Sequence, residues 1–198
     1  MQYKVAAITQ SADELEAQLQ HPELYATKVA NLKPESRRRL EVLAVRCLLK
    51  QMTGEEQAIL YDAHGAPSLA SGDSYISISH TDGYVAAIIG QNPVGIDIER
   101  RGRRVERVRS KFLQEAEEVL VAQTSDPVLT MHLIWSAKEA VFKFLGPDYY
   151  DLQRLTQVTS IDFAQSQMSM QVKGLDHPLT ISFEYTNDYV LCHSSIQY

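Results

Sequence analysis

The sequence has few of the residues that would give it a covalent or metal-bound scaffold. Only two cysteines occur among 198 residues, Cys47 and Cys192, and neither lies in a CxxC or CxxH pattern. This scarcity argues against the disulfide framework of a small secreted protein and against a structural zinc site. We therefore expect two reduced thiols in the hydrophobic core.

Long hydrophobic segments are missing as well. No apolar run is long enough to cross a bilayer, and the opening residues, MQYKVAAIT, lack the zones of a signal peptide and instead predict a strand. Hydrophobic residues make up 44% of the chain and charged residues 22%, as in ordinary globular proteins. These features predict a cytoplasmic protein without a membrane partner, built as one large domain or two small ones.

The chain carries a net charge of −6, but its basic residues are concentrated in two places. Residues 100–111, RRGRRVERVRSK, contain seven basic side chains against the single acid Glu106, and Arg37, Arg38 and Arg39 form a second cluster. Local basic strips on an acidic protein indicate anionic partners at defined positions rather than nucleic acid. The alternative for each cluster is a solvated surface.

Two ten-residue segments resemble each other. ISISHTDGYV at residues 76–85 and ISFEYTNDYV at residues 181–190 share five identities at a constant offset of 105 (181 minus 76). Both alternate around a polar turn, which predicts hairpins, and a helical pattern precedes each. We therefore expect an α+β fold of two similar α/β halves, related by a pseudo-twofold axis, with a ligand cleft between them.

The two halves are expected to span residues 1–92 and 93–198. Hydrophobic periodicity and turn residues predict the remaining elements. Strands are predicted over residues 3–9, 75–80, 84–90, 94–99, 157–163, 168–173, 179–185 and 189–195, and helices over residues 12–20, 35–52, 114–122 and 129–145.

The segment VGIDIER contains two acids on one face of a predicted strand. Side chains alternate along a strand, so Asp97 and Glu99 point to the same side while the intervening apolar residues point to a core. Adjacent carboxylates repel each other, and a hard divalent cation such as Mg²⁺ removes that repulsion. The alternative is a solvated strand face.

The segment WSAKEAVFKFLG predicts a helix that is apolar nearly all round and therefore buried. Glu139 and Lys143 are four residues apart and lie on one face. A buried carboxylate needs a cation, a hydrogen-bond network or a raised pKa. Glu139 is thus a candidate third metal ligand and Lys143 a candidate phosphate contact, with a simple Glu139–Lys143 pair as the alternative.

The segment SISHTDGYV places Ser79 and His80 at the end of a predicted strand. A hydroxyl and an imidazole can both donate a hydrogen bond to a phosphate oxygen. A histidine that merely belongs to a hairpin turn is the alternative.

These three segments, in this order, resemble the 4'-phosphopantetheinyl transferase superfamily. That family has a GxDxE strand, here residues 95–99, and a W-S/T-x-K-E-A/S-x-x-K helix, here residues 135–143, while residues 76–80, ISISH, match its upstream motif. The form of the helix motif and the chain length are similar to the double-length, surfactin-synthetase-activating type. That type serves secondary metabolism and often fatty acid synthesis.

The resemblance implies a site and a reaction. Magnesium would be bound by Asp97, Glu99 and Glu139, the coenzyme A pyrophosphate by that metal and Lys143, the nucleotide phosphates by Ser79 and His80, and the 3'-phosphate by the cluster containing Arg37 and Arg38. The enzyme would transfer phosphopantetheine from coenzyme A to a serine of an apo acyl or peptidyl carrier protein and release 3',5'-ADP. Glu139 would accept the serine proton, and Glu117 matches a family acid with a supporting proton-transfer role.

Further expectations concern partners. Carrier proteins of this family's kind present an acidic helix, so the basic strip at residues 100–111 is expected to dock the carrier, and a duplicated fold suffices as a monomer. One departure is Ala66 in Gly65-Ala66-Pro67, where the family usually has lysine. The alternatives are a magnesium-dependent phosphohydrolase of coenzyme A or nucleotides, and an inactive module that binds coenzyme A or a carrier.

Overall fold

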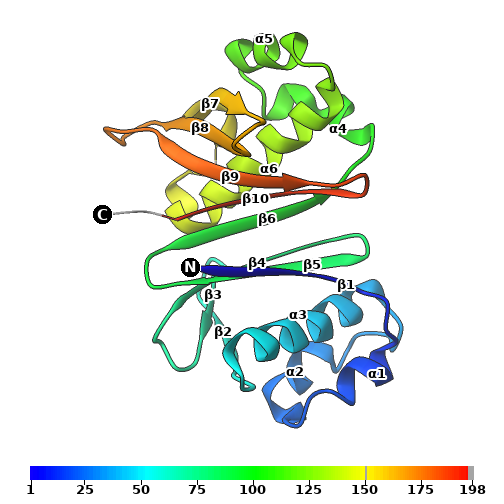
Figure 1. Ribbon diagram of the computed structural model, residues 1–198. Helices are drawn as coiled ribbons and strands as arrows, with labels where there is room; N and C mark the ends of the chain where they lie inside the picture. Colours follow the sequence, from blue (N-terminus) through cyan, green and yellow to red (C-terminus); the bar gives the residue numbers. More distant parts are fainter. Residues whose placement is uncertain (150, 196–198) are drawn as a thin grey trace. The chain divides into compact units, whose positions relative to one another are not determined.

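The computed structural model describes residues 1–149 and 151–195. Its contacts divide the chain into two compact units, Met1–Val94 and Gly95–Tyr198. Each unit contains one five-stranded sheet, which confirms the predicted mixed α+β class (Figure 1). The two units are described separately below.

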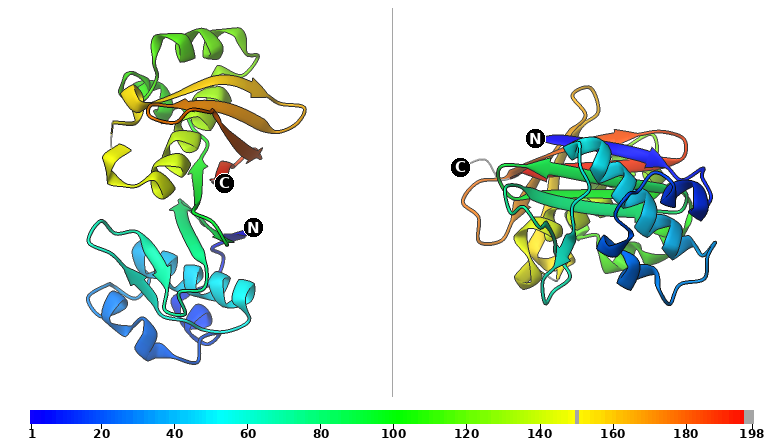
Figure 2. Two further views of the ribbon diagram at one scale, coloured as in Figure 1. Left: turned by 90° about the vertical axis from the view of Figure 1, so that its left-hand side faces the viewer. Right: turned by 90° about the horizontal axis from the view of Figure 1, so that it is seen from below.

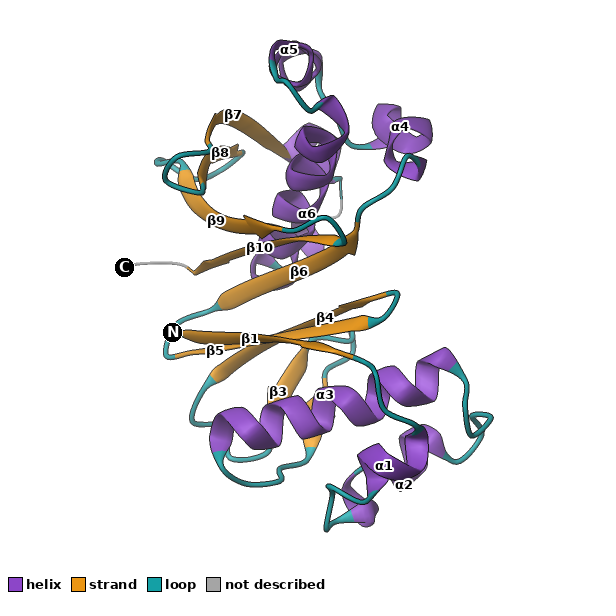
Figure 3. Ribbon diagram, turned by 45° about the vertical axis from the view of Figure 1, so that its right-hand side comes forward, coloured by secondary structure: helices purple, strands orange, loops and turns teal. Residues whose placement is uncertain are grey.

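The first unit places its helices on one face of its sheet, as Figure 3 shows. The sheet is antiparallel, with the order β1-β5-β4-β3-β2. Its elements are β1 (Gln2–Ala7), α1 (Ala12–Glu16), η1 (Pro22–Leu24), α2 (Ala26–Val29), α3 (Arg37–Thr53), β2 (Ile59–Tyr61), β3 (Pro67–Leu69), β4 (Tyr75–Thr81) and β5 (Tyr84–Gly90).

Helix α3 is the long helix of the first unit and crosses its sheet, as the view from below in Figure 2 shows. The helix begins where the Ser36 side chain accepts a hydrogen bond from the Arg39 amide, and it ends at Gly54, whose φ of 85° favours glycine. Its apolar face, with Leu43 and Leu48 fully buried, packs on β1 and β5. This packing fixes the start of α3 beside the end of β4.

The second unit has the sheet order β6-β10-β9-β8-β7, and its long helix α6 packs against β9 and β10. Its elements are β6 (Val94–Arg100), α4 (Arg104–Val108), η2 (Arg109–Lys111), α5 (Glu115–Gln123), α6 (Pro127–Leu145), η3 (Pro147–Tyr149), α7 (Leu152–Leu155), β7 (Thr156–Asp162), β8 (Gln167–Val172), β9 (Leu179–Tyr185) and β10 (Tyr189–Ser195).

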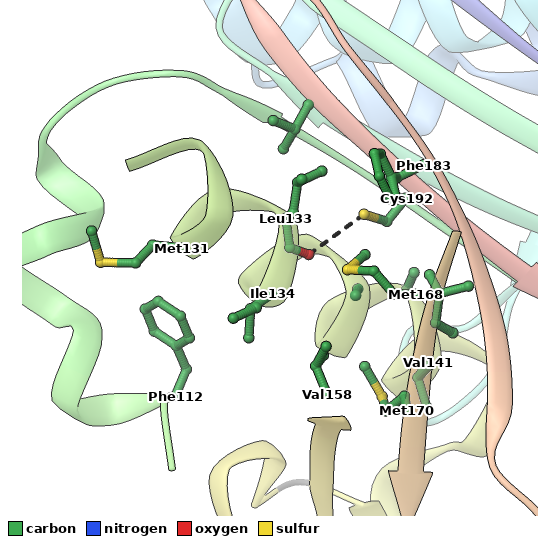
Figure 4. Packing of buried hydrophobic residues seen from close by; sticks show 14 of the residues in the cluster. Phe112, Met131, Leu133, Ile134, Val141, Val158, Met168, Met170, Phe183 and Cys192 are labelled. Carbon is green, nitrogen blue, oxygen red and sulfur yellow. Dashed lines mark hydrogen bonds between the residues drawn. The ribbon is translucent and has the colours of Figure 1, made fainter. Parts of the chain in front are cut away.

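Figure 4 shows the core of the second unit between α6 and the sheet. Leu133 and Ile134 of α6 meet Met168 and Phe183 of the sheet, and all four are at most 2% exposed. The Cys192 thiol donates to the Leu133 carbonyl at 3.5 Å, so this cysteine is a reduced core residue, as predicted. Burial raises the pKa of the Cys47 thiol in the first unit to about 11.

The two sheets have the same connectivity. In each sheet the first strand of the unit lies beside its last strand, and the other three strands follow in reverse chain order. The repeated segments form the β4–β5 and β9–β10 hairpins, as predicted. In the first hairpin Thr81 pairs with Tyr84, so the turn is the dipeptide Asp82-Gly83, and Gly83 has the positive φ of 80° that this turn requires.

Several short elements differ from expectation. The predicted helix at residues 12–20 ends at Glu16, and the chain continues in turns closed by hydrogen bonds from Gln18 to Leu15 and from Leu19 to Glu16. The short elements β2, β3, α2, α4 and α7 were not expected, because three to five residues carry too little periodicity to be recognised. Within the described residues, every helix is too short or too polar to span a membrane.

Candidate functional site

The acids of the GxDxE segment lie against helix α6, because Gly95 lets the helix approach β6. A Cβ atom at Gly95 would lie 1.8 Å from the Ala140 carbonyl oxygen, so only glycine fits there. The strand face that carries Gly95 and Asp97 therefore packs on α6, and Asp97 is only 5% exposed. The alternative of a solvated strand face is wrong, because α6 covers it.

Two long side chains of α6, Trp135 and Lys143, reach across to β6. The Trp135 indole Nε1 donates to Glu99 Oε1 at 3.0 Å, and the Lys143 ammonium donates to Asp97 Oδ1 and to the Ile96 carbonyl, both at 2.8 Å. Lys143 therefore pairs across to the strand rather than with Glu139 on its own helix. Helical spacing places Glu139 one turn from both Trp135 and Lys143, on the same face.

The electrostatics of this acid cluster favour a bound cation. Burial, and then the negative charge of Asp97, raise the pKa of Glu99 to about 7, while the Trp135 hydrogen bond opposes the shift. Burial and the charge of Asp97 likewise raise the pKa of Glu139, against the effect of Lys143. Each half-buried acid is thus held near negative charge that one ammonium group balances only in part.

The chemistry of these acids fits a hard divalent cation, since all three are carboxylates, the oxygen donors that such a cation prefers. In the described part of the chain, however, no three acidic, histidine or cysteine side chains converge closely enough to form a metal site. The Oδ1 atom of Asp97 is instead engaged by Lys143. Metal binding at this cluster would thus require changes of side-chain rotamer.

Glu117 lies inside the second unit. Its carboxylate accepts hydrogen bonds from the Lys138 ammonium at 2.7 Å and from the Gln114 and Val158 amides at 2.8 Å, and Lys138 also donates to the Phe112 and Thr156 carbonyls. Both charged side chains are 0% exposed. This buried pair argues against a proton-transfer role for Glu117 and gives Lys138, the first lysine of the helix motif, a structural role. The sequence signal for this role was a charged residue, Lys138, within an almost wholly apolar helix.

A basic cluster forms in the first unit where α3 begins beside the end of β4. The buried Glu41 carboxylate accepts from Arg37 Nε at 2.8 Å and lies 3.4 Å from Arg38 Nη1 and 3.2 Å from His80 Nδ1. A cavity of about 140 Å³ opens beside these groups. It is lined by Arg38, Glu41, Val42, Val45, Arg46, Tyr61, Gly65, Pro67, Ile78 and His80.

Not every expected member joins the basic cluster. The Arg39 guanidinium donates to Glu16 and to the Val29 carbonyl, which ties α3 to α1 and α2. Ser79 is buried and, as the strand neighbour of His80, faces the other side of the sheet. Ala66 lies exposed in the β2–β3 loop, between two residues that line the cavity. Glu41 was missed, although its spacing of four residues from Arg37 signals a helical ion pair.

The basic strip at residues 100–111 is partly neutralised within its own unit. Arg101 pairs with Asp126 at 2.7 Å, Arg103 with Glu106 at 2.8 Å, and Arg109 with Glu118 at 3.5 Å. Among the described residues, no ion pair involves the exposed basic side chains Arg104, Arg107 and Lys111. Helix α4 and the turn η2 therefore present three uncompensated positive charges.

Comparisons with known proteins agree on one family. The model of the 4'-phosphopantetheinyl transferase superfamily matches residues 93–193, just over half of the chain, and this range contains the whole acid cluster. A curated protein of Aneurinibacillus migulanus, 4'-phosphopantetheinyl transferase gsp, is 30% identical over 148 residues, which are 71% of this chain and 60% of that protein. The chain thus spans less than two thirds of the length of this relative. The chain belongs to the 4'-phosphopantetheinyl transferase superfamily.

Proposed function

We propose that the protein transfers the 4'-phosphopantetheine group of coenzyme A to a serine of an apo acyl or peptidyl carrier protein and releases 3',5'-ADP. The observation that carries this proposal is the cluster of Asp97, Glu99, Glu139 and Lys143 between β6 and α6, inside the segment that the family model matches. The relative from A. migulanus, a 4'-phosphopantetheinyl transferase, supports the same reaction.

In this proposal Asp97, Glu99 and Glu139 would hold Mg²⁺. When bound, the ion would supply positive charge to the pyrophosphate of coenzyme A. Burial and the charge of Asp97 raise the pKa values of Glu99 and Glu139, and this supports the assignment because a bound cation would favour the charged form of both acids. Removal of divalent ions with EDTA is therefore expected to abolish transfer.

The transfer forms a bond between the carrier serine oxygen and the β-phosphorus and breaks the bond from that phosphorus to 3',5'-ADP. Glu139 accepts the serine proton, directly or through water, as a carboxylate beside the proposed metal site. Lys143 leaves Asp97 to contact the pyrophosphate as charge develops on the leaving group.

The basic cluster of the first unit is the proposed contact for the nucleotide phosphates. Arg37 and Arg38 are exposed at the start of α3, and the His80 side chain is 37% exposed. Of the two expected β4 contacts His80 is the better supported, because Ser79 faces the other side of the sheet. The pseudo-twofold relation of the two units and a ligand cleft between them stay predictions, as does the monomeric state.

The exposed charges of α4 and η2 are the proposed docking surface for the acidic helix of a carrier. Arg104, Arg107 and Lys111 are the side chains available for this contact. We expect the KM for the carrier to rise as salt concentration rises, because salt screens attraction between exposed charges. A KM that does not change with salt would contradict this docking surface.

Mass spectrometry of an apo acyl carrier protein, incubated with the protein, coenzyme A and Mg²⁺, tests the reaction. The expected result is the gain of one phosphopantetheine, lost when EDTA is added. Release of 3',5'-ADP without a carrier would identify a phosphohydrolase instead. Binding of coenzyme A without transfer to several carriers would identify an inactive module.

A further inference from the structure

Trp135 is the single tryptophan of the chain, and its indole is bonded to an acid of the proposed metal site. The indole Nε1 donates to Glu99 Oε1 at 3.0 Å. An indole N–H can only donate, and a hydrogen bond to a carboxylate is stronger than one between neutral groups. Within the described residues no other side chain donates to Glu99. The contact therefore holds one carboxylate oxygen and leaves Oε2 without a donor.

The strand that carries Glu99 is bonded to the same turn of α6. The fully buried Ser136, next to Trp135, donates through its hydroxyl to the Asp97 carbonyl at 3.1 Å. This bond fixes the backbone of β6 two residues before Glu99. A glutamate side chain has three rotatable bonds, and ordering it costs free energy. With its backbone and its carboxylate both held by α6, Glu99 is ordered before any ligand binds.

The indole is itself held in place by Phe112. The two rings meet edge to face, with centroids 5.2 Å apart and planes at 65°, the geometry that aromatic pairs prefer. Phe112 is fully buried, and its backbone is fixed on both sides. Its amide donates to the Arg109 carbonyl at 3.2 Å, and its carbonyl accepts from the buried Lys138 ammonium at 2.7 Å. The Lys138 ammonium thus supports the ring that supports the indole.

The neighbouring acid Glu139 differs from Glu99 in this respect. Both acids are half-buried, and Glu139 lies one helical turn from Trp135. Among the residues that the structure describes, however, no group donates a hydrogen bond to the Glu139 carboxylate. The structure therefore orders one of these two acids and leaves the other to turn. Glu99 would be the preset ligand of a cation, and Glu139 a ligand that moves to meet it.

We propose that Trp135 is a positioning residue of the acid cluster, which holds Glu99 with Oε2 available to the proposed Mg²⁺, and that Phe112 holds the indole in that position. A cation that meets an ordered carboxylate does not have to order it. Loss of such an outer contact typically lowers metal affinity by about 10–100-fold. This inference rests on the proposed transferase site, and Trp135 acts in it through Glu99 without touching the ion.

The indole contact can be tested in the ligand-free protein, because one tryptophan gives one indole cross peak in ¹H–¹⁵N NMR. We expect this peak downfield of free tryptophan, as for an N–H bonded to a carboxylate. Glu99→Ala should move the peak upfield, while the matched change Glu139→Ala, which removes a half-buried acid of the same cluster, should leave it in place. A peak that shifts equally in both variants, or in neither, would overturn the inference.

The effect on the metal is measured with Mn²⁺, which suits the same carboxylate ligands and whose free form gives an EPR signal. The full chain is titrated at a fixed concentration of coenzyme A, with a protein-free titration subtracted. We expect Trp135→Phe, which removes the N–H and keeps an aromatic ring, to weaken Mn²⁺ binding by about tenfold. Excess Mg²⁺ should restore most of the transfer rate of this variant, because its metal ligands are intact.

Two further variants separate positioning from stability. Phe112→Leu should weaken Mn²⁺ binding less than Trp135→Phe does, since the indole N–H remains. Phe183→Leu is the matched control, because Phe183 is also buried and has an edge-to-face partner, but that partner is Phe163 and not Trp135. Thermal unfolding gives the stability of each variant. We expect Phe183→Leu to lower the midpoint and leave Mn²⁺ affinity unchanged.

The outcomes distinguish this inference from the proposed function. If the wild type and Trp135→Phe bind Mn²⁺ equally well, Trp135 does not position Glu99, and the proposed transfer remains intact. If Phe183→Leu weakens Mn²⁺ binding as much as Phe112→Leu does, the role assigned to Phe112 is wrong. A wild type that binds no Mn²⁺ would overturn both the proposed metal site and the role of Trp135.

Discussion

The two units share a scaffold and differ in charge. Each has a five-stranded sheet in which the first strand lies beside the last, and one long helix packed on it. In the first unit one buried acid, Glu41, gathers Arg37, Arg38 and His80; in the second, one ammonium group, Lys143, meets an acid cluster. The same arrangement of strands and helix therefore carries a basic cluster in one unit and an acid cluster in the other.

The two clusters also differ in depth. Arg37 and Arg38 of the basic cluster are exposed, whereas Asp97 is buried and Glu99 and Glu139 of the acid cluster are half-buried. Charges that are removed from water interact more strongly and are less easily replaced than exposed charges. We therefore expect substitutions in the second unit to have larger effects than substitutions in the first.

The largest expected effect follows from removing an acid of the second unit. Asp97→Ala or Glu139→Ala should lower kcat/KM for transfer to a carrier by about 10²–10⁴-fold, because each takes away a proposed ligand of the metal. Circular dichroism would establish that the variants are folded. Glu115→Ala, which removes an exposed acid of α5, is the control. Near-normal activity of a folded Asp97→Ala or Glu139→Ala variant would contradict the proposed site.

The next effect compares ion pairs of the two units. Lys138→Met leaves Glu117 charged and buried in the second unit and should lower the free energy of unfolding by about 3–5 kcal/mol. The same change at Lys50, whose pair with Glu56 is partly exposed, should cost about 1 kcal/mol. Urea unfolding measures both. Equal losses of unfolding free energy at Lys138 and Lys50 would show that burial does not determine how much each ion pair contributes.

A third substitution tests how closely α6 approaches β6. Gly95→Ala should destabilise the protein by about 3 kcal/mol or more, because the new methyl group would overlap the Ala140 carbonyl. Gly102→Ala is the matched control, since no atom lies within 4 Å of its added Cβ. Thermal unfolding gives the two midpoints. If both glycines tolerate alanine equally, the close contact between strand and helix is absent in solution.

The smallest expected effect follows from adding one positive charge beside the basic cluster of the first unit. Ala66→Lys restores the lysine that the family usually has and should tighten coenzyme A binding by roughly fivefold, the effect of one exposed charge contact. Ala63→Lys adds the same charge elsewhere in the same exposed loop. Calorimetric titration compares the two variants. Equal gains in affinity would indicate general electrostatic attraction and not a contact at position 66.

The residues of the acid cluster could be predicted from the sequence, but their contacts could not. Alternation along a strand selected Asp97 and Glu99, the helical repeat selected Glu139 with Lys143, and the resemblance to the family joined the two pairs into one site. Their individual contacts were not predictable, because Lys143 bonds to Asp97 and Trp135 to Glu99 across 46 and 36 residues of sequence. Such distant pairs depend on how the helix lies on the strand, which no local pattern specifies.

The basic cluster shows a limit of sequence-based prediction. The three consecutive arginines looked like one unit, yet Arg39 stabilises the packing of α1 and α2, while Arg37 and Arg38 surround Glu41. Consecutive residues on a helix point about 100° apart, so a run of like charges is divided among different surroundings. The orientation of each arginine is set by what lies around the helix.

The sequence by itself determined the α+β class, the hairpins, the two long helices and the residue types of the acid cluster, because these follow from local periodicity and turn chemistry. Only the tertiary structure decided that Lys138 and Glu117 form a buried pair and that Glu41 organises the basic cluster. Those outcomes depend on which charged groups become desolvated together, and desolvation is a property of the folded chain.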